Sequence, residues 1–221
     1  MARRLGILGG SFDPIHLGHL RSAEEVRETL ALDLVYFVPA HEPPHKPQRQ
    51  LASGRDRLAM AERAIADNPA FRVSAIEIER GGVSYSVDTL AAFAARESDA
   101  TLFFVLGIDA FREMQTWKDV VRVFELANVA VTSRPPHAAE PSIEHLPVAA
   151  REAFCYDPAT LSFRHRTGTT LQFLPITGID VSATAVRERA RRGSSIRYLV
   201  PSSVERYVRE HRLYRSGEAN T

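Results

Sequence analysis

The sequence contains a single cysteine, Cys155, so no disulfide can form within the chain. This excludes a small secreted fold held by disulfides and fits a reducing compartment. No apolar stretch approaches the ~20 residues that a membrane-spanning helix needs. The apolar run that follows Arg4 is cut by Ser11 and Asp13, too early for the core of a signal peptide. We therefore expect a soluble cytoplasmic protein that does not bind a membrane.

A strong charge of either sign is also missing. Lys and Arg number 28 and Asp and Glu number 27, which gives a formal net charge of +1. Dedicated nucleic-acid-binding domains are usually strongly basic, so we expect no nucleic-acid partner. The chain has 221 residues, of which 44% are hydrophobic and 25% charged, as in an ordinary globular domain. The prediction is one domain over residues 1–215, followed by a disordered tail at 216–221.

Short apolar runs alternate with amphipathic segments along the chain. The expected strands are 3–9, 33–40, 71–79, 101–107, 128–135 and 171–181, and helices are expected between them and after the last one. Three serines precede or begin predicted helices as N-caps: Ser53, Ser86 and Ser182. Apolar runs without alternation are typical of strands buried on both faces. The pattern predicts an α/β, Rossmann-like, doubly wound fold with a mainly parallel sheet of about five to six strands and helices on both faces.

Residues 136–168 form the least readable segment, rich in Pro, Ala, His and polar residues. A helix near 142–154 is the only element that we expect there. We interpret the segment as a surface insertion or as an oligomerisation element of a homo-oligomer.

The stretch GGSFDPIHLGH, residues 9–19, connects the first predicted strand to the first helix. Ligands of parallel sheets bind at the carboxyl ends of the strands, where this stretch lies. Its glycines permit close backbone approach or a positive φ, and the following helix offers free N–H groups to an anion. The stretch matches neither the Walker loop nor G-x-G-x-x-G, and only Glu42 follows the second strand as an acidic group, which disfavours an NAD-dependent dehydrogenase.

His16 and His19 stand at i, i+3 spacing at the helix start and project from one face. As hydrogen-bond donors they would stabilise charge on a phosphoryl group. Zinc binding is a second option, because the chain has eight histidines, including His41 and His45 at i, i+4 spacing. A third option is purely structural, with one histidine capping the helix and the other facing solvent. The spacing alone does not choose among the three.

The whole pattern at 9–19 resembles the signature of the HxGH nucleotidyltransferase superfamily. Further segments, in consistent order, resemble the bacterial nicotinate mononucleotide adenylyltransferases: VPAHEPPHK (38–46), SYSVDTL (84–90), LGIDAFREMQTW (106–117), SRP (133–135) and the stretch 180–208. The resemblance implies transfer of AMP from ATP to nicotinate mononucleotide by direct displacement, with release of pyrophosphate. It also implies Mg²⁺ carried on the ATP phosphates, without a metal site of protein ligands.

The resemblance implies an ATP-binding set, with His16 and His19 as the catalytic pair on the phosphates. The other ATP-binding positions belong to the glycine turn, to a loop that holds ribose and adenosine, and to a second phosphate-binding helix start: Gly9, Ser11, Phe12, Gly107, Asp109, Ser182, Thr184 and Arg187. A carboxylate suits ribose hydroxyls because it only accepts hydrogen bonds. On sequence alone, a helix N-cap is the alternative role of Asp109.

The resemblance also implies an acceptor-binding set. Trp117 would stack on the nicotinate ring, although the residue alone is equally compatible with the core. Thr89 takes the position associated with the nicotinate carboxylate. The remaining positions surround the mononucleotide or its phosphate: Lys46, Tyr85, Asp88 and Arg134.

Besides a zinc hydrolase that would use His16 and His19, two other functions remain as alternatives. One is a related adenylyltransferase that acts on phosphopantetheine or on nicotinamide mononucleotide, although SYSVDTL and QTW favour a pyridine substrate. The other is a nucleotide-binding regulator that keeps the phosphate turn without turnover.

Overall fold

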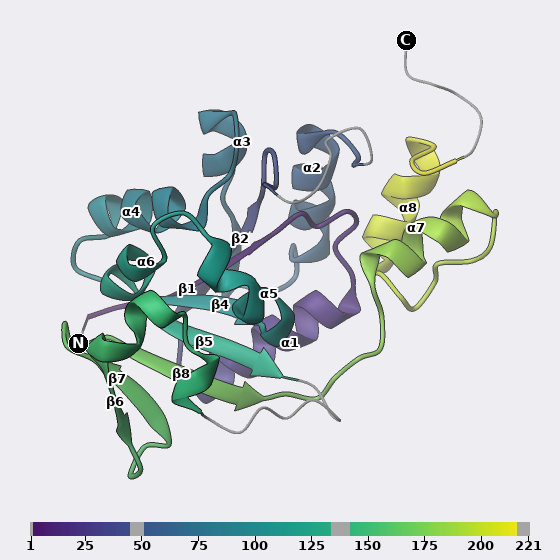
Figure 1. Ribbon diagram of the computed structural model, residues 1–221. Coiled ribbons are helices and arrows are strands. Elements are labelled where there is room, and N and C mark those ends of the chain that lie inside the picture. Colours follow the sequence, from purple (N-terminus) through teal and green to yellow (C-terminus); the bar gives the residue numbers. More distant parts are fainter. Residues whose placement is uncertain (1, 45–50, 134–141, 216–221) are drawn as a thin grey trace.

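The computed structural model describes residues 2–44, 51–133 and 142–215. They form one sheet in the strand order β3-β2-β1-β4-β5-β8-β7-β6 (Figure 1). Six neighbouring strands are parallel: β3 (Phe71–Val73), β2 (Leu34–Pro39), β1 (Arg4–Gly10), β4 (Thr101–Gly107), β5 (Asn128–Ser133) and β8 (Thr170–Pro175). The last two are antiparallel to their neighbours: β7 (Ser162–His165) and β6 (Phe154–Asp157).

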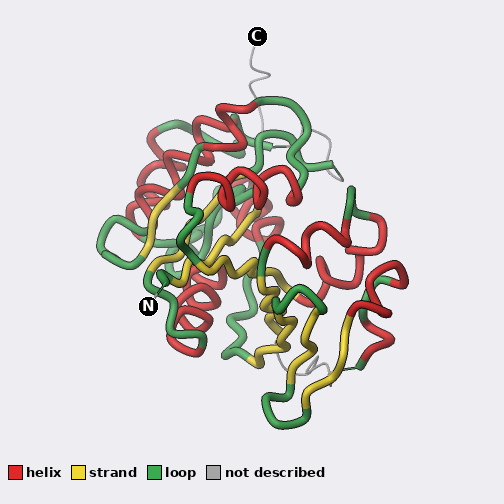
Figure 2. Tube along the Cα trace, turned by 90° about the vertical axis from the view of Figure 1, so that its left-hand side faces the viewer, coloured by secondary structure: helices red, strands yellow, loops and turns green. Residues whose placement is uncertain are grey.

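Helices lie on both sides of this sheet (Figures 1 and 2). The α-helices are α1 (Leu17–Thr29), α2 (Gly54–Ala64), α3 (Ile76–Arg80), α4 (Ser86–Arg96), α5 (Ile108–Glu113), α6 (Val120–Leu126), α7 (Ala183–Arg191) and α8 (Ser202–Glu210). Short 3₁₀ segments of the described residues are η2 (Met114–Thr116), η3 (Ile143–His145) and η4 (Val148–Ala153). No helix in these ranges is long and apolar enough to span a bilayer.

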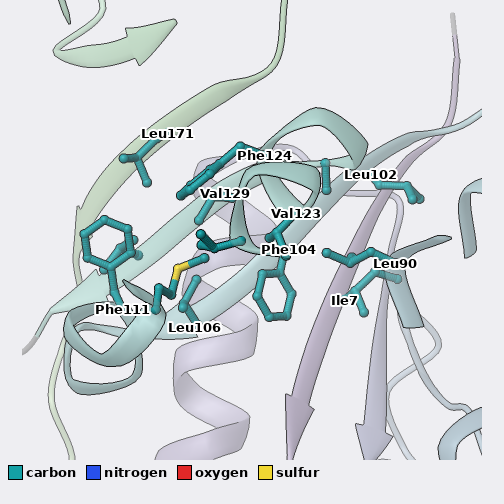
Figure 3. Packing of buried hydrophobic residues seen from close by; sticks show 14 of the residues in the cluster. Ile7, Leu90, Leu102, Phe104, Leu106, Phe111, Val123, Phe124, Val129 and Leu171 are labelled. Carbon is teal, nitrogen blue, oxygen red and sulfur yellow. The ribbon is translucent and has the colours of Figure 1, made fainter. Parts of the chain in front are cut away.

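The core has two parts, one on each face of the sheet. Successive residues of β4 show why: Phe104 belongs to the cluster beneath α4, α5 and α6, whereas Phe103 and Val105 belong to the cluster beneath α1, α2, α7 and α8. Figure 3 shows the first cluster, with Phe104, Leu106 and Phe111 packed together. A strand buried on both faces cannot alternate apolar with polar residues, which is the pattern in the sequence. The predicted doubly wound, mainly parallel α/β fold is confirmed.

The predicted number of strands, five to six, is wrong, because the sheet has eight. The two additional strands form the β6–β7 hairpin, which falls within the segment interpreted as an insertion. Each is only four residues long, and β6 lies at the sheet edge with Cys155 and Tyr156 exposed. Such short strands carry too few residues for a readable alternation.

The strand predicted over 71–79 is also wrong in its second half. β3 pairs with β2 only along Phe71–Val73, and the N–H of Ser74 then donates to the carbonyl of Phe37. The chain continues as α3, which turns Glu77 inward. Of the predicted serine caps, Ser53 and Ser182 are confirmed, whereas Ser86 is the first residue of α4 and Tyr85 takes the cap position.

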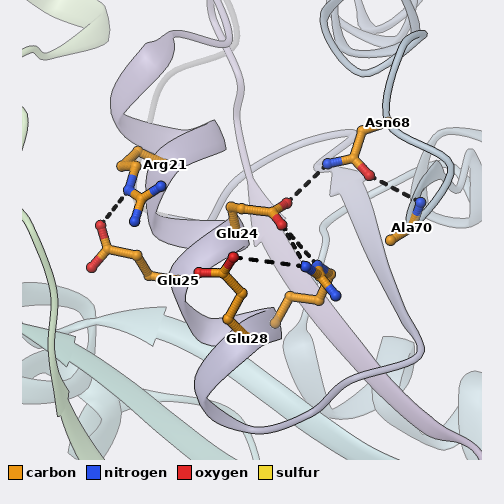
Figure 4. Close-up of polar contacts among 7 residues, drawn as sticks. Arg21, Glu24, Glu25, Glu28, Asn68 and Ala70 are labelled. Atoms are coloured by element: carbon orange, nitrogen blue, oxygen red, sulfur yellow. Dashed lines mark hydrogen bonds and ion pairs between the residues drawn. The ribbon is translucent and has the colours of Figure 1, made fainter.

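Polar contacts fix α1 to the elements beside it (Figure 4). Glu24 accepts hydrogen bonds from Arg27 and from the side chain of Asn68, which in turn accepts the N–H of Ala70. The bond from Arg27 is the main reason why the pKa of Glu24 lies below its ordinary value. On the other side of the helix, the N–H of Thr177 donates to Glu25 over 2.7 Å. These contacts join α1 to the segment before β3 and to the segment after β8.

Candidate active site

The turn between β1 and α1 lies where the strand order reverses. From β1 the chain crosses to β2 on one side, whereas β4 flanks β1 on the other. In open α/β sheets this switch point, at the carboxyl ends of the strands, is where ligands bind. The turn therefore occupies the position predicted from GGSFDPIHLGH.

His16 and His19 lie together at the start of α1. Their rings are stacked, with centroids 3.7 Å apart and an angle of 22° between the planes. His16 is buried, and its backbone N–H donates to Nδ1 of His19 over 3.2 Å. An Nδ1 that accepts a hydrogen bond carries no proton, so the neutral ring of His19 is protonated at Nε2 and is a donor there.

The glycine between the two histidines, Gly18, lies in a crowded position. A Cβ on Gly18 would lie 3.1 Å from Val181 and 3.2 Å from the ring of His16, so a side chain there would require one of these neighbours to shift. Gly9 differs, because a Cβ there would meet nothing within 4 Å. The positive φ that we considered for the glycine pair lies instead at Phe12, whose φ is 46°.

Arg57 of α2 binds the backbone of the β1–α1 turn. It is 2% exposed, and burial lowers the pKa of its guanidinium below the ordinary value. The side chain donates to four backbone carbonyls: Ser11 at 2.9 Å, Ala40 at 2.5 Å, His41 at 3.1 Å and Ala52 at 3.0 Å. One buried cation thus joins the β1–α1 turn to the segments after β2 and before α2. Sequence reasoning missed this residue because nothing in the surrounding helical pattern distinguishes it from a solvent-facing arginine.

The start of α7 meets the same turn. Ser182 is the N-cap, and its Oγ accepts the N–H of Ala185 over 3.2 Å. Arg187 donates to Oγ1 of Thr184 over 3.1 Å and to the backbone carbonyl of Asp13 over 2.7 Å. The structure therefore brings Ser182, Thr184 and Arg187 to the histidine turn, although more than 160 residues separate the two segments.

Gly107 is the last residue of β4, the neighbour of β1 in the sheet, and Asp109 lies in the first turn of α5. Gly107 is the N-cap residue of α5 without a side-chain bond, so Asp109 does not cap this helix. The carboxylate of Asp109 is 84% exposed and lies 3.7 Å from Arg112. This carboxylate is an exposed hydrogen-bond acceptor at the carboxyl edge of the sheet, and its role toward the ATP ribose stays a prediction.

A hollow of about 120 Å³, called the second hollow because it is separate from the histidine turn, lies beside the predicted acceptor-binding residues. Tyr85 and Trp117 line it, and so does Lys118, which sequence reasoning missed. Trp117 is half-buried and packs edge-on against Phe104, with centroids 6.2 Å apart, so it is part of both the wall and the core. The ammonium of Lys118 lies 4.8 Å above the ring of Tyr85 and 3.0 Å from the carboxylate of Asp88. Its position directly after Trp117 in the sequence was the available signal.

Thr89 does not line this hollow. Its side chain is buried, donates to Glu77 over 2.5 Å and accepts from Arg80 over 3.1 Å. Burial raises the pKa of Glu77 above its ordinary value. The proposed contact of Thr89 with a nicotinate carboxylate is untested, but its hydroxyl is engaged within the fold.

Two predicted acceptor residues, Lys46 and Arg134, lie outside the described residues. Within the described ranges, no group of three or more His, Cys, Asp or Glu side chains could hold a metal ion. The zinc interpretation of the histidine pair therefore has no further ligands in this part of the chain.

Comparison with known proteins identifies the family. The model of the cytidylyltransferase-like family matches residues 7–189, a range that contains the starts of α1 and α7. The chain belongs to this family. A protein of Citrifermentans bemidjiense named as a probable nicotinate-nucleotide adenylyltransferase is 47% identical over 96% of this chain and 98% of its own length. One of Syntrophotalea carbinolica with the same name is 46% identical over 97% and 99%.

A solved structure has the same fold. The nicotinic acid mononucleotide adenylyltransferase of Plasmodium falciparum, complexed with NaAD, superposes with a TM-score of 0.70 over 96% of this chain and 97% of its own, at 15% identity. The resemblance inferred from the motifs, to a nucleotidyltransferase family with an α/β fold, is confirmed.

Proposed function

We propose that the chain transfers AMP from ATP to nicotinate mononucleotide as a step of NAD biosynthesis. An oxygen of the acceptor's 5′-phosphate attacks the α-phosphorus of ATP, and the bond between the α- and β-phosphates breaks. Pyrophosphate leaves, and nicotinate adenine dinucleotide forms. Both bond changes occur between substrates, so no protein nucleophile is required.

One observation carries the proposal: two helix starts with hydrogen-bond donors meet at the switch point of the sheet. α1 contributes the stacked histidines, and α7 contributes Ser182, Thr184 and Arg187. Helix N-termini attract phosphate through their free N–H groups and their dipoles. The arrangement suits a triphosphate better than a single carboxylate, because the donors come from two sides.

The histidines act as donors in this proposal. Because Nδ1 of His19 accepts the N–H of His16, the ring is fixed in the form that donates from Nε2. A donor fixed before the reaction stabilises negative charge on the transferring phosphoryl group without rearranging. Each such donor typically contributes ~10²- to 10³-fold in rate, and the remainder comes from positioning.

Lys118 supports an acidic acceptor in the second hollow. Among the described residues that line the hollow, it alone is charged, and its side chain is 50% exposed. A nicotinate carboxylate can form an ion pair with this ammonium, whereas the neutral nicotinamide group offers only an uncharged carbonyl acceptor. Trp117 and Tyr85 provide the aromatic faces for the ring.

The metal in this proposal arrives with ATP. Mg²⁺ neutralises charge on the triphosphate when it is bound there. No site residue of the chain is assigned as a metal ligand; Asp109 is assigned to ribose. We also propose that the protein is cytoplasmic. The homo-oligomer stays a prediction. So does the single domain over 1–215 with an insertion at 136–168.

The decisive experiment offers the purified protein ATP and Mg²⁺ with nicotinate mononucleotide, nicotinamide mononucleotide or phosphopantetheine, and measures pyrophosphate and the adenylylated product. We expect the highest kcat/KM with nicotinate mononucleotide. Activity with phosphopantetheine alone would replace this function by the related one. ATP binding without pyrophosphate release in any reaction would indicate a regulator instead.

A further inference from the structure

The end of the described chain reaches back to the phosphate turn. Tyr214, which follows α8, donates a hydrogen bond from its hydroxyl to Oδ1 of Asp13 over 2.6 Å. Asp13 lies 201 positions earlier in the sequence, and its side chain is 0% exposed. The same oxygen accepts the N–H of Ala52 over 3.1 Å, and Arg187 lies 3.7 Å from Oδ2.

Asp13 belongs to a turn whose backbone needs support. Phe12 precedes it with a φ of 46°, in the left-handed region that residues with a Cβ rarely adopt. Such conformations persist when the surroundings fix them. Here Arg57 binds the carbonyl of Ser11, Arg187 binds the carbonyl of Asp13, and Tyr214 binds the Asp13 side chain.

The turn is in contact with the catalytic pair. The ring of Phe12 is buried and meets the ring of His19 edge-on, with centroids 5.2 Å apart. The histidine pair begins three residues after Asp13. A shift of the Asp13 carboxylate therefore reaches His19 through the Phe12 ring and through the backbone that leads into α1.

We propose that Tyr214 is a positioning residue for adenylyl transfer: by holding the Asp13 carboxylate, it keeps Phe12 and His19 in the geometry that the reaction requires. This inference rests on the proposed function. Burial and the neighbouring Asp13 raise the pKa of Tyr214, so its hydroxyl is protonated and can donate at neutral pH. The residue acts through the turn and touches no substrate.

The test is Tyr214→Phe, which removes one hydroxyl and keeps the ring. Asp13 retains its bond from Ala52, so the variant is expected to fold. We expect kcat to fall about tenfold at saturating substrates, with KM values changed less than twofold, because a misaligned donor weakens the transition state more than ground-state binding. The matched control is Tyr198→Phe, since Tyr198 is 84% exposed, and its kcat should equal that of the unmodified protein.

A second measurement reports on the structure of the turn independently of catalysis. Hydrogen–deuterium exchange should be about tenfold faster in peptides that cover residues 10–17 of Tyr214→Phe, and unchanged in β4 and β5. If the unmodified protein makes no product from nicotinate mononucleotide, the proposed function fails, but this local change would still support the hold of Tyr214 on the turn. Unchanged exchange at 10–17 would overturn the inference. A lower melting temperature with full kcat per folded molecule would also overturn it, because the role of Tyr214 would then be structural only.

Discussion

The two ends of the candidate active site are built differently. At the phosphate end, buried groups from distant parts of the chain converge on one short turn: Asp13 and Arg57 are almost inaccessible to solvent. At the acceptor end, Trp117 is half-buried, Lys118 is 50% exposed, and the hollow between them is small. The first end is fixed before any ligand arrives, whereas the second presents side chains that a ligand must still cover.

This difference matches the chemistry proposed for each end. Charge develops on the phosphoryl group, and donors that are already in place stabilise it most. The pyridine ring of the acceptor does not react, so its contacts contribute binding and selectivity. We therefore expect changes at the phosphate end to appear mainly in kcat, and changes at the acceptor end to appear mainly in kcat/KM for one substrate.

The largest effect is expected for His19→Ala. Loss of the Nε2 donor should lower kcat at least ~10²-fold, because one preorganised donor to a developing charge typically contributes that much. Steady-state kinetics with saturating ATP and nicotinate mononucleotide measures it, and circular dichroism checks folding. The control is His211→Ala. His211 directly follows α8, and its ring is exposed and stacks on Tyr207. A folded His19→Ala protein with more than a tenth of the original kcat would contradict the catalytic role.

The phosphate end also shows how far the sequence alone leads. The two histidines, their helix start and the α7 start were predictable, because caps and glycines leave local signals in the sequence. Arg57 and Tyr214 were not, because their partners lie 46 and 201 positions away and depend on the tertiary fold. The hydrogen bond from Thr89 to Glu77 was not predictable either, because it joins α4 to α3 in the folded chain; the role of Thr89 toward a ligand stays a prediction.

The fold also has a part that was predictable from the sequence and a part that was not. The six parallel strands follow from apolar runs that the two-sided core requires, so the sheet and its buried faces were predictable. The β6–β7 hairpin was not, since an edge strand of four residues needs only Phe154 buried and leaves Cys155 and Tyr156 exposed. Pairing with β8, not local pattern, defines this hairpin.

A smaller effect is expected for Trp117→Ala, at the acceptor end. Stacking of a ring on an aromatic side chain contributes ~1–3 kcal/mol, so kcat/KM for nicotinate mononucleotide should fall about tenfold or more. KM for ATP should change little. Trp117→Phe keeps a stacking face and the contact with Phe104, and should lose clearly less. Equal losses for both variants, with a lowered melting temperature, would mean that Trp117 serves the core and not the acceptor.

Lys118→Met should alter selectivity more than rate. We expect the ratio of kcat/KM for nicotinate over nicotinamide mononucleotide to fall about fivefold, a modest figure because the ammonium is half-exposed and already paired with Asp88. Arg122→Met is the matched control: its side chain is 54% exposed and it removes a charge that does not line the hollow. If both variants change the ratio equally, the effect is general electrostatics and Lys118 has no specific role in selecting the acid.

The smallest effect is expected far from both ends, at His165 in β7. The imidazole is 1% exposed, contacts Thr167 at Nδ1 over 2.7 Å and packs on Phe154, and burial lowers its pKa below the ordinary 6.5, with Arg166 adding to the shift. A base whose pKa is lowered by folding stabilises the protein fully above its unfolded pKa, and that stability is lost as the pH falls below it.

Between pH 7.5 and 5.5 the unmodified protein should therefore lose about 1 kcal/mol more than His165→Asn, or about 2–4 °C in melting temperature. Asn keeps a polar atom near the Nδ1 position but does not titrate. Calorimetry across this range measures the difference, and kcat of His165→Asn at neutral pH should equal that of the unmodified protein, because the hairpin lies on the opposite edge of the sheet from β3 and away from the β1–β4 switch point. If kcat changes in His165→Asn while the pH dependence of its stability does not, the β6–β7 hairpin is coupled to the active site. The difference between the phosphate end and the acceptor end would then depend on this edge of the sheet as well.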